Sequence, residues 1–438
     1  MSSTTVIELA NDITNAFAEI TRIAPSMLPL RQAGLDRFKR SGFPTTNEED
    51  WRFTSLKPFT EIPFEIMTDS GEQLLDQATL DEIAFSQHDT DNLVFIDGHF
   101  SDQLSQISDQ PEGVTVSNLA SAFDIIDNKI GLLSGKDENP LIALNDAFFT
   151  DGAWIHIPAN HSLSKPVHLV FLSTAKKDGQ ASHSRNLIIA ESNAKGTIIE
   201  SHISLGHAAA STNVVTESQL EDGSNLEHIK LQDQSPQSIH LASLHSNLGK
   251  EARYAFHSFA LGAQLSRNNL RMNLAKPGID CMLNGLYMTR GSQLADHHMI
   301  VNHAAPHCDS HEYFNGILYD QSRGVFHGRI LVQPEAQKTD AKQTNKNLIL
   351  SEEATVNTKP QLEIYADDVK CTHGATIGEL DKDAIFYLRA RGLDTKAAQQ
   401  MLMHGFTGEI VDRIQHNAIR EELNELVWSR LENEHNLN

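Results

Sequence analysis

Hydrophobic residues in the first 60 positions recur every three or four residues, the spacing of helices that bury one face. The first such run consists of Val6, Leu9, Ile13, Phe17 and Ile20. Pro25 is expected to end that helix, and a second run over residues 27–42 stops at Gly42. Residues 65–90 are mixed and acidic, which suggests a linker with a short helix. We therefore predict a mostly helical N-terminal region over residues 1–92.

From about residue 93 the pattern changes to short alternating or β-branched runs, separated by Gly, Asn, Asp or Ser. Such runs at close spacing predict β-strands. No helical run of 10–15 residues alternates with them, which argues against a doubly wound α/β sheet and leaves a sandwich, a barrel or a solenoid. The clearest runs are "NLVFIDG", "AWIHIP", "VHLVFLS", "NLIIAES", "GTIIESHIS", "NVVTESQL" and "NLEHIKLQ".

Internal similarity decides among these architectures. Residues 262–265 (Gly-Ala-Gln-Leu) recur 29 residues later as residues 291–294 (Gly-Ser-Gln-Leu). Residues 284–287 (Asn-Gly-Leu-Tyr) recur 31 residues later as residues 315–318 (Asn-Gly-Ile-Leu). A period near 30 that contains several short strands suits one coil of a parallel β-solenoid. We therefore predict a mainly β fold, with the solenoid over residues 93–378.

The end of the chain returns to a helical pattern. Asp381 begins a run that closes on Gly392, an Asp-Thr pair begins a second run that stops near Gly405, and residues 417–434 form a last amphipathic run. We predict a C-terminal helical domain over residues 379–438. A solenoid needs covered ends, and this chain has helical segments at both of them.

Composition narrows the function classes. The 438 residues carry a net charge of −23, which disfavours nucleic-acid partners and anionic membrane surfaces. We expect no secretory signal and no membrane span, because the N-terminus lacks a basic-then-apolar pattern and no run of about 18 apolar residues occurs. The cysteines are three in number, Cys281, Cys308 and Cys371, which argues against a disulfide framework. We therefore expect a cytoplasmic protein.

One candidate for metal chemistry is the histidine-rich stretch over residues 297–327. In a strand, His297 and His298 point to opposite faces and cannot share one ion, although ligands could still converge from different coils. A metal site and ordinary surface or core histidines both remain open, and so does a metal-dependent β-solenoid hydrolase or lyase. The histidines are His297, His298, His303, His307, His311 and His327, with Asp296 and Cys308 among them.

Residues 337–368 are rich in Gln, Asn, Thr and Lys. They are interpreted either as a polar ligand groove or as stacked turns whose side chains satisfy backbone groups between coils. The chain contains neither a G-x-x-x-x-G-K-[ST] nor a G-x-G-x-x-G motif, so we expect no nucleotide-binding loop.

The second candidate is the pair Cys371 and His373. Two residues apart on a strand, they share one face about 6–7 Å apart, so both could reach one ion or a small cluster. Two ligands are too few to close a site, which would need partners from another coil or another chain. The same face also carries Val369, Ala375 and Ile377, so a plain buried strand is the alternative.

Three longer stretches carry a family resemblance: "NEEDWRFTSLKPF", "RGVFHGRILVQPEAQKTDAKQTNKNLILSEEA" and "LEIYADDVKCTHGATIGELDKDAIFYLRARGL". They resemble the SufB/SufD family of iron–sulfur cluster assembly scaffold subunits. The Cys-x-His-Gly-Ala stretch and the short N-terminal region place the resemblance in its SufD branch. The resemblance covers most of the chain and is most specific from about 323 to 392.

The resemblance implies a right-handed parallel β-helix between helical domains, and a scaffold rather than an enzyme. It implies a SufB-like partner and a SufC-like ABC ATPase that supplies the ATP hydrolysis, in support of de novo cluster assembly and iron acquisition. It assigns His373 to a nascent cluster site shared at the subunit interface, as a candidate iron ligand, with Cys371 as its motif neighbour. The cluster would be transient, with none expected in the isolated chain. A homodimer is the alternative when the partner is absent.

Overall fold

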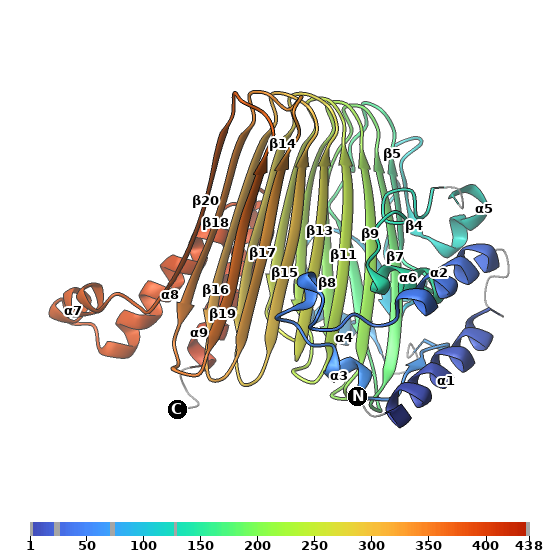
Figure 1. Ribbon diagram of the computed structural model, residues 1–438, viewed down its shortest axis with the longest axis horizontal. Helices are drawn as coiled ribbons and strands as arrows, with labels where there is room; N and C mark the ends of the chain where they lie inside the picture. The colour runs from blue at the N-terminus through green and yellow to red at the C-terminus, as the bar shows by residue number, and fades with distance from the viewer. Residues whose placement is uncertain (1–2, 22–26, 71–74, 127–128, 435–438) are drawn as a thin grey trace.

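The computed structural model describes residues 3–21, 27–70, 75–126 and 129–434 and shows a parallel β-solenoid of about eight turns (Figure 1). Helices of the N-terminal region lie at one end, and three C-terminal helices lie near the other. The predicted mainly β fold with helices on both sides is confirmed. Successive strands alternate between two ten-stranded sheets, so each coil contributes one strand to each sheet.

The chain up to residue 148, which includes the predicted N-terminal region and the segment after it, combines short helices and strands. The predicted first and second helices are present, and the second ends where Gly42 adopts a φ of 68°. Pro25 lies outside the described residues. The elements are α1 (Ser3–Ile20), α2 (Leu28–Ser41), a 3₁₀ turn (Glu49–Trp51), α3 (Lys57–Thr60), β1 (Glu65–Ile66), α4 (Gln77–Asp81), β2 (Asp91–Ile96), β3 (His99–Phe100), β4 (Thr115–Asn118), a 3₁₀ turn (Ala120–Ala122), α5 (Phe123–Ile126) and α6 (Pro140–Phe148).

The odd-numbered strands form the first sheet, in the order β19-β17-β15-β13-β11-β9-β7-β5-β4, with β1 paired to β7. Each predicted run of residues 153–232 coincides with a strand of one of the two sheets. The strands of the first sheet are β5 (Ala153–Ile157), β7 (Gln180–Ala190), β9 (Ser211–Leu220), β11 (Ile239–Leu248), β13 (Leu265–Leu274), β15 (Leu294–His303), β17 (Arg323–Val332) and β19 (Thr355–Ile364).

The even-numbered strands form the second sheet, in the order β20-β18-β16-β14-β12-β10-β8-β6-β2-β3. Inward-facing apolar side chains of both sheets, among them Leu283, Met299 and Phe314, form the core between them. The further strands are β6 (Val167–Ser173), β8 (Lys195–Ser204), β10 (Asn225–Asp233), β12 (Arg253–Ala260), β14 (Asp280–Thr289), β16 (Asp309–Leu318), β18 (Asp340–Ile349) and β20 (Lys370–Gly378).

The strand register agrees with one of the two predicted sequence repeats and not with the other. Leu265 pairs with Leu294, so the 29-residue repeat is a true coil. Asn284 pairs with Tyr313 rather than with Asn315, so the 31-residue repeat does not mark ladder partners, and that part of the prediction is wrong. The coil that contains it is 29 residues long, and the next coil, from β16 to β18, is 31 residues long. The length of a coil therefore varies with the length of its turns, and a short sequence match does not identify the residues that pair between coils.

Helix α6 is joined to the first sheet through buried charges. Arg185 of β7 donates to Asp146 of α6 at 2.7 Å and to Glu217 of β9, and all three side chains are at most 2% exposed. Arg37 of α2 donates to the other oxygen of Asp146 at 2.6 Å. These ion pairs fix the N-terminal helices to the outer face of the solenoid.

The C-terminal helices are α7 (Lys382–Ala390), α8 (Thr395–Val411) and α9 (Asn417–Glu434). The predicted caps are confirmed, since Asp381 and Asp394 accept hydrogen bonds from backbone amides in the first turns of α7 and α8. The predicted stop near Gly405 is wrong, because α8 continues through it to Val411. A mid-helix glycine costs only about 1 kcal/mol, and the apolar side chains of α8 bury against the second sheet.

Helices α8 and α9 pack on the outer face of the second sheet, where Met403, Ile410 and Leu423 meet Phe259 and Leu286. They therefore do not close the last coil, as a cap at the C-terminal end would. Helix α7 projects away from the solenoid body (Figure 1). Within the described residues, no helix combines the length and the apolar character that crossing a bilayer requires.

Candidate functional site

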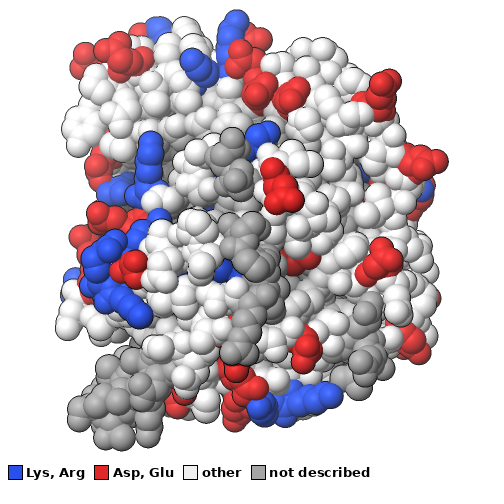
Figure 2. Space-filling view, turned by 90° about the vertical axis from the view of Figure 1, so that its right-hand side faces the viewer, with Lys and Arg blue, Asp and Glu red and all other residues white. Residues whose placement is uncertain are grey.

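The last coil of the solenoid has two free strand edges. Among the described residues, strand β19 pairs only with β17, and strand β20 pairs only with β18. Both lie at the end of the solenoid from which α7 projects (Figure 1). At the opposite end, helices of the N-terminal region lie against the first coils (Figure 1). Figure 2 shows this end of the molecule, where Lys and Arg side chains are mixed with Asp and Glu side chains. The two ends of the solenoid therefore differ in what a partner chain could contact.

The two free edges are not equivalent. In β19, Thr355 donates its amide to Ser322 of the preceding coil, so the even-numbered residues face the free edge. Pro360 is one of these and has no amide hydrogen to offer there. In β20, Lys370 donates to Thr339, so residues 371, 373, 375 and 377 direct their backbone groups to the free edge. None of these is proline, so β20 offers an unbroken row of donors and acceptors.

Cys371 and His373 lie on β20 and face the interior of this open coil. Their ladder partners are Ala341 and Gln343 of β18. Cys371 is half-buried against a small apolar cluster that includes Ile330 and Ala341, whereas His373 is exposed. The alternative of a plain buried strand is therefore wrong for His373. The strand alternates as predicted, but within the described part of the chain no further coil stacks on this one, so the interior is open at this end.

The two predicted ligands differ in their electrostatic surroundings. Burial raises the pKa of the Cys371 thiol, which disfavours the thiolate that binds metals. Among the described residues, the His373 side chain makes no hydrogen bond, so both ring nitrogens are accessible to a ligand. An imidazole and a thiol on one open face fit the donor set of an iron–sulfur cluster, and His373 is the better placed of the two.

Beneath His373, a column of polar side chains extends inward. Strand register aligns Glu312, Gln343 and His373 on three successive coils. Gln343 donates to Glu312 at 2.5 Å, and both side chains are fully enclosed. A methyl group on Gly328 would lie 2.3 Å from the Gln343 amide nitrogen, so only glycine leaves room for this amide. The column therefore places an ionisable carboxyl two coils below the open face.

We predict that Glu312→Gln removes a pH dependence of stability. Burial raises the pKa of Glu312 to about 7, against 4.5 for the free side chain. The folded chain thus keeps a proton that the unfolded chain releases, so stability falls as pH rises from about 4.5 to about 7. Glutamine stays neutral and keeps the shape. The variant should gain up to about 3 kcal/mol of unfolding free energy over the parent at about pH 8, and little at about pH 4.

Urea unfolding of both proteins at the two pH values measures this difference. Exposed Glu353→Gln is the matched control and should change neither value. Equal unfolding free energies for the Glu312→Gln variant and the parent at about pH 8 would show that burial does not raise the pKa of this carboxyl.

The histidine-rich stretch does not converge as a whole. His297 faces inward between Tyr287 and Phe314, where burial lowers its pKa to about 3. His303 also faces inward and bonds to Ser310 at 2.8 Å, and His307 lies in an exposed turn. The prediction that His297 and His298 face opposite sides is confirmed, because His298 lies on the outer face. Most of these histidines are therefore dispersed core or surface residues.

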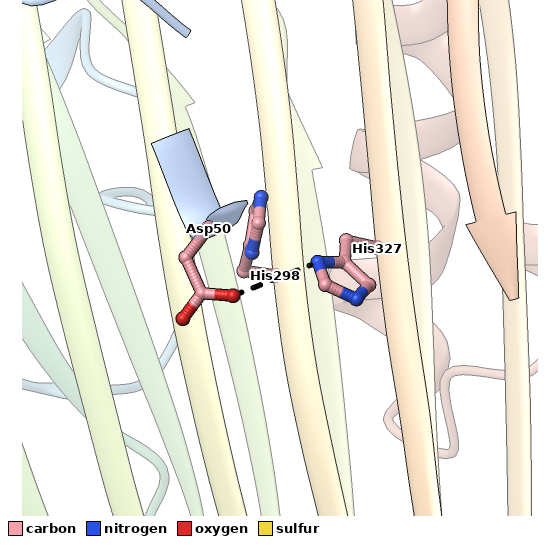
Figure 3. A group of neighbouring side chains, drawn as sticks. All are labelled: Asp50, His298 and His327. Carbon is pink, nitrogen blue, oxygen red and sulfur yellow. Dashed lines mark ion pairs between the residues drawn. The ribbon is translucent and has the colours of Figure 1, made fainter. Parts of the chain in front are cut away.

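Two histidines do meet on the outer face. His298 of β15 and His327 of β17 are ladder partners, with ring centroids 4.7 Å apart. Asp50 of the N-terminal region joins them, and Figure 3 shows the three side chains together. Burial, with Arg267 nearby, lowers the pKa of His298 far below its usual value. Asp50 was not among the predicted site residues, because nothing local in the sequence indicates which strand the segment covers.

The polar stretch over residues 337–368 forms mainly strands β18 and β19. The interpretation of this stretch as stacked turns is therefore wrong. On the inner face, Asn345 and Asn347 bond to each other and to Tyr287. On β19, Asn357, Thr358 and Lys359 line a cavity of about 710 Å³ together with residues 46–50, 52 and 53. The alternative of a polar groove thus coincides with a real cavity.

Exposed apolar side chains gather near the open end. Of eleven large hydrophobic side chains that are exposed among the described residues, seven lie between residues 364 and 401. Phe386 of α7 is 73% exposed, more than most apolar side chains of folded proteins. Such a concentration marks a surface suited to another protein. The seven are Ile364, Tyr365, Ile377, Phe386, Tyr387, Leu393 and Met401.

Comparison with known proteins agrees with this architecture. Residues 171–406 match the family model described as "SUF system FeS cluster assembly, SufBD core domain", and residues 5–169 match the SufBD protein N-terminal region. An iron–sulfur cluster assembly SufBD family protein of Synechocystis is 34% identical over 413 residues, covering 91% of this chain and 90% of its own length. The iron–sulfur cluster assembly protein SufD of Escherichia coli is 31% identical over 410 residues, covering 92% and 93%.

Proposed function

The chain belongs to the SufBD family of the SUF iron–sulfur cluster assembly system, and we propose that it serves there as a SufD-type scaffold subunit. In this proposal, the open end of its solenoid forms one side of a cluster-assembly site that a second chain completes. The observation that carries the proposal is the position of His373. It is an exposed imidazole on the inner face of a coil that nothing in the described part of the chain covers.

The chain's own residues would act by binding and positioning. His373 would supply one nitrogen ligand to the nascent cluster, and Cys371 stands beside it as a weaker candidate because its thiol is partly buried. Two donors cannot complete the coordination of an iron centre, so further ligands must come from elsewhere. The cluster is the cargo of this site and would leave it after assembly.

A SufB-like subunit is the proposed partner at the free edge of β20. An unpaired strand edge is a template for strand addition from another chain, and β20 lacks the proline that interrupts β19. A SufC-like ABC ATPase is the proposed partner of the C-terminal helices, where Phe386, Tyr387 and Met401 are exposed. ATP hydrolysis would then belong to that ATPase, whose movement would shift the two solenoids against each other and open or close the shared site.

We predict that Ala375→Pro weakens the association with the SufB-like subunit. Ala375 directs its amide to the free edge, so proline removes one donor there without breaking the ladder to β18. Ala375→Ser keeps the amide and is the matched control. Tagged chains are expressed at native levels and the co-purified proteins are identified. The proline variant should recover several-fold less of the second subunit, while the serine variant recovers as much as the parent.

Equal recovery by both variants would contradict strand addition at β20. If the parent chain captures only further copies of itself, the edge serves a homodimer and the proposed heteromeric scaffold is wrong. The other candidate function, metal-dependent hydrolysis or lyase chemistry that uses the histidine-rich stretch as a whole, is less well supported. Only His298 and His327 of the six histidines meet, and the family is one of cluster assembly.

A further inference from the structure

Asp50, His298 and His327 form a compact group on the outer face of the first sheet. One potential ligand atom from each lies within 4.8 Å of the others. The two histidines stand side by side on β15 and β17, and Asp50, from a 3₁₀ turn of the N-terminal region, lies next to them (Figure 3). His373 faces the inside of the last coil, so this group is separate from the proposed cluster site.

The imidazole of His327 is oriented by its neighbour on β19. Its Nε2 lies 2.7 Å from the carbonyl oxygen Oε1 of Gln361, so Nε2 carries the proton and donates it. The lone pair therefore resides on Nδ1. That nitrogen faces the Asp50 carboxylate at 4.0 Å.

His298 lies beside a buried carboxylate. Its Nε2 is 3.2 Å from Oδ1 of Asp296, an enclosed oxygen that accepts no hydrogen bond from the described residues. The other oxygen of Asp296 accepts from Arg267 at 2.6 Å and from Thr54. Histidines that bind metals typically donate their second ring nitrogen to a carboxylate or a carbonyl oxygen in this way. His327 has such a hydrogen bond, and Nε2 of His298 lies next to a free carboxylate oxygen that could accept one after a small rotation of the ring.

The backbone of Asp50 is fixed while its carboxylate stays accessible. Arg267 donates to the Asp50 carbonyl at 2.9 Å, and its guanidinium lies 3.7 Å from the centre of the buried Trp51 ring. Next to it, Glu49 pairs with Lys359 of β19 at 2.5 Å. The side chain of Asp50 remains 57% exposed and borders the cavity of about 710 Å³. It can therefore move the short distance that metal bonds of about 2.0–2.2 Å require.

We propose that Asp50, His298 and His327 bind one divalent first-row transition-metal ion, with the remaining coordination positions open to the cavity. Two imidazoles and one carboxylate select ions such as Fe²⁺, Co²⁺ or Zn²⁺ over Mg²⁺ and Ca²⁺, which prefer oxygen ligands. Open positions beside three protein ligands would let the ion exchange or accept a small ligand. The site lies outside the proposed cluster-assembly site and does not depend on it.

Cobalt titration of the full-length purified chain tests the proposal, because the visible spectrum of Co²⁺ reports its coordination. The wild type should bind one Co²⁺ with the spectrum of histidine and carboxylate ligation. Asp50→Asn is the main variant, since Asp50 is exposed and its loss does not threaten folding. The Co²⁺ affinity of this variant should fall by at least about 10–100-fold, because the loss of a residue that only supports a metal ligand already costs that much. His327→Gln should have a similar effect.

Exposed His207→Gln is the matched control and should bind Co²⁺ as the wild type does. His373→Ala should also bind normally, which separates this site from the proposed cluster ligand. Unchanged affinity in Asp50→Asn, or loss of binding in His373→Ala with Asp50→Asn unaffected, would overturn the assignment. Absence of Co²⁺ binding by the folded wild type would overturn it as well.

Discussion

Replacement of His373 by alanine is expected to reduce the iron and acid-labile sulfide that the reconstituted complex retains by about tenfold or more. The imidazole is exposed on the inner face of the last coil and is the better placed of the two predicted donors. Alanine removes the ligand, and because the side chain makes no hydrogen bond with the described residues, the fold loses little. Cluster loading should thus fall without a matching loss of stability.

Two further variants sharpen this expectation. Cys371→Ser should reduce loading less, because the thiol of Cys371 is half-buried and its pKa is raised. His373→Cys keeps a soft donor on the same face and should restore part of the loading. Iron and sulfide analysis is compared with the melting temperature of each chain. Wild-type loading in His373→Ala would refute the role proposed for this residue.

The second large effect concerns stability. Arg185→Met is expected to lower the free energy of unfolding by about 3–5 kcal/mol, the usual result of removing one partner from a buried ion pair. Arg185 lies between Asp146 and Glu217, and all three side chains are at most 2% exposed. Methionine fills much of the volume but leaves Glu217 without its cation in an enclosed site.

Arg37→Met is the matched control for this change. Arg37 also pairs with Asp146, but its side chain is 30% exposed and Asp146 would keep Arg185 as a partner. Its loss should cost under about 1 kcal/mol. Urea unfolding followed by fluorescence and by circular dichroism measures both variants. If the two cost the same, the buried pairs do not carry the stability assigned to them.

Local patterns predicted strands β2 and β5 to β10 and the starts of the C-terminal helices α7 and α8. Asp381 and Asp394 mark helix N-termini because their short side chains reach the free backbone amides, an interaction that involves only neighbouring residues. The end of α8 could not be predicted in the same way. Gly405 resembles a stop signal, but burial of neighbouring α8 side chains against the second sheet outweighs its low helix propensity.

In the candidate site, too, the features that depend on local spacing were predicted, and those that depend on contacts between distant segments were not. Strand alternation correctly placed Cys371 and His373 on one face, because it depends only on residue spacing. The predicted end of the solenoid at residue 378 placed both in the last coil, but their exposure was not predicted, because the C-terminal helices were expected to cover that coil and instead pack on the outer face of the second sheet. Asp50 meets His298 and His327 only through the path of the N-terminal segment across the sheet. No spacing within the sequence indicates that contact.

The most direct test of the shared cluster site is nitrogen hyperfine spectroscopy of the reconstituted complex, with ¹⁵N-labelled histidine in this chain alone. The chain is assembled with its partners, a cluster is built and reduced, and pulsed electron paramagnetic resonance is recorded. A ¹⁵N coupling of ligand strength should appear with the wild-type chain and disappear with His373→Ala. A complex that carries a cluster but shows no ¹⁵N coupling, or one that keeps the coupling in His373→Ala, would contradict the account.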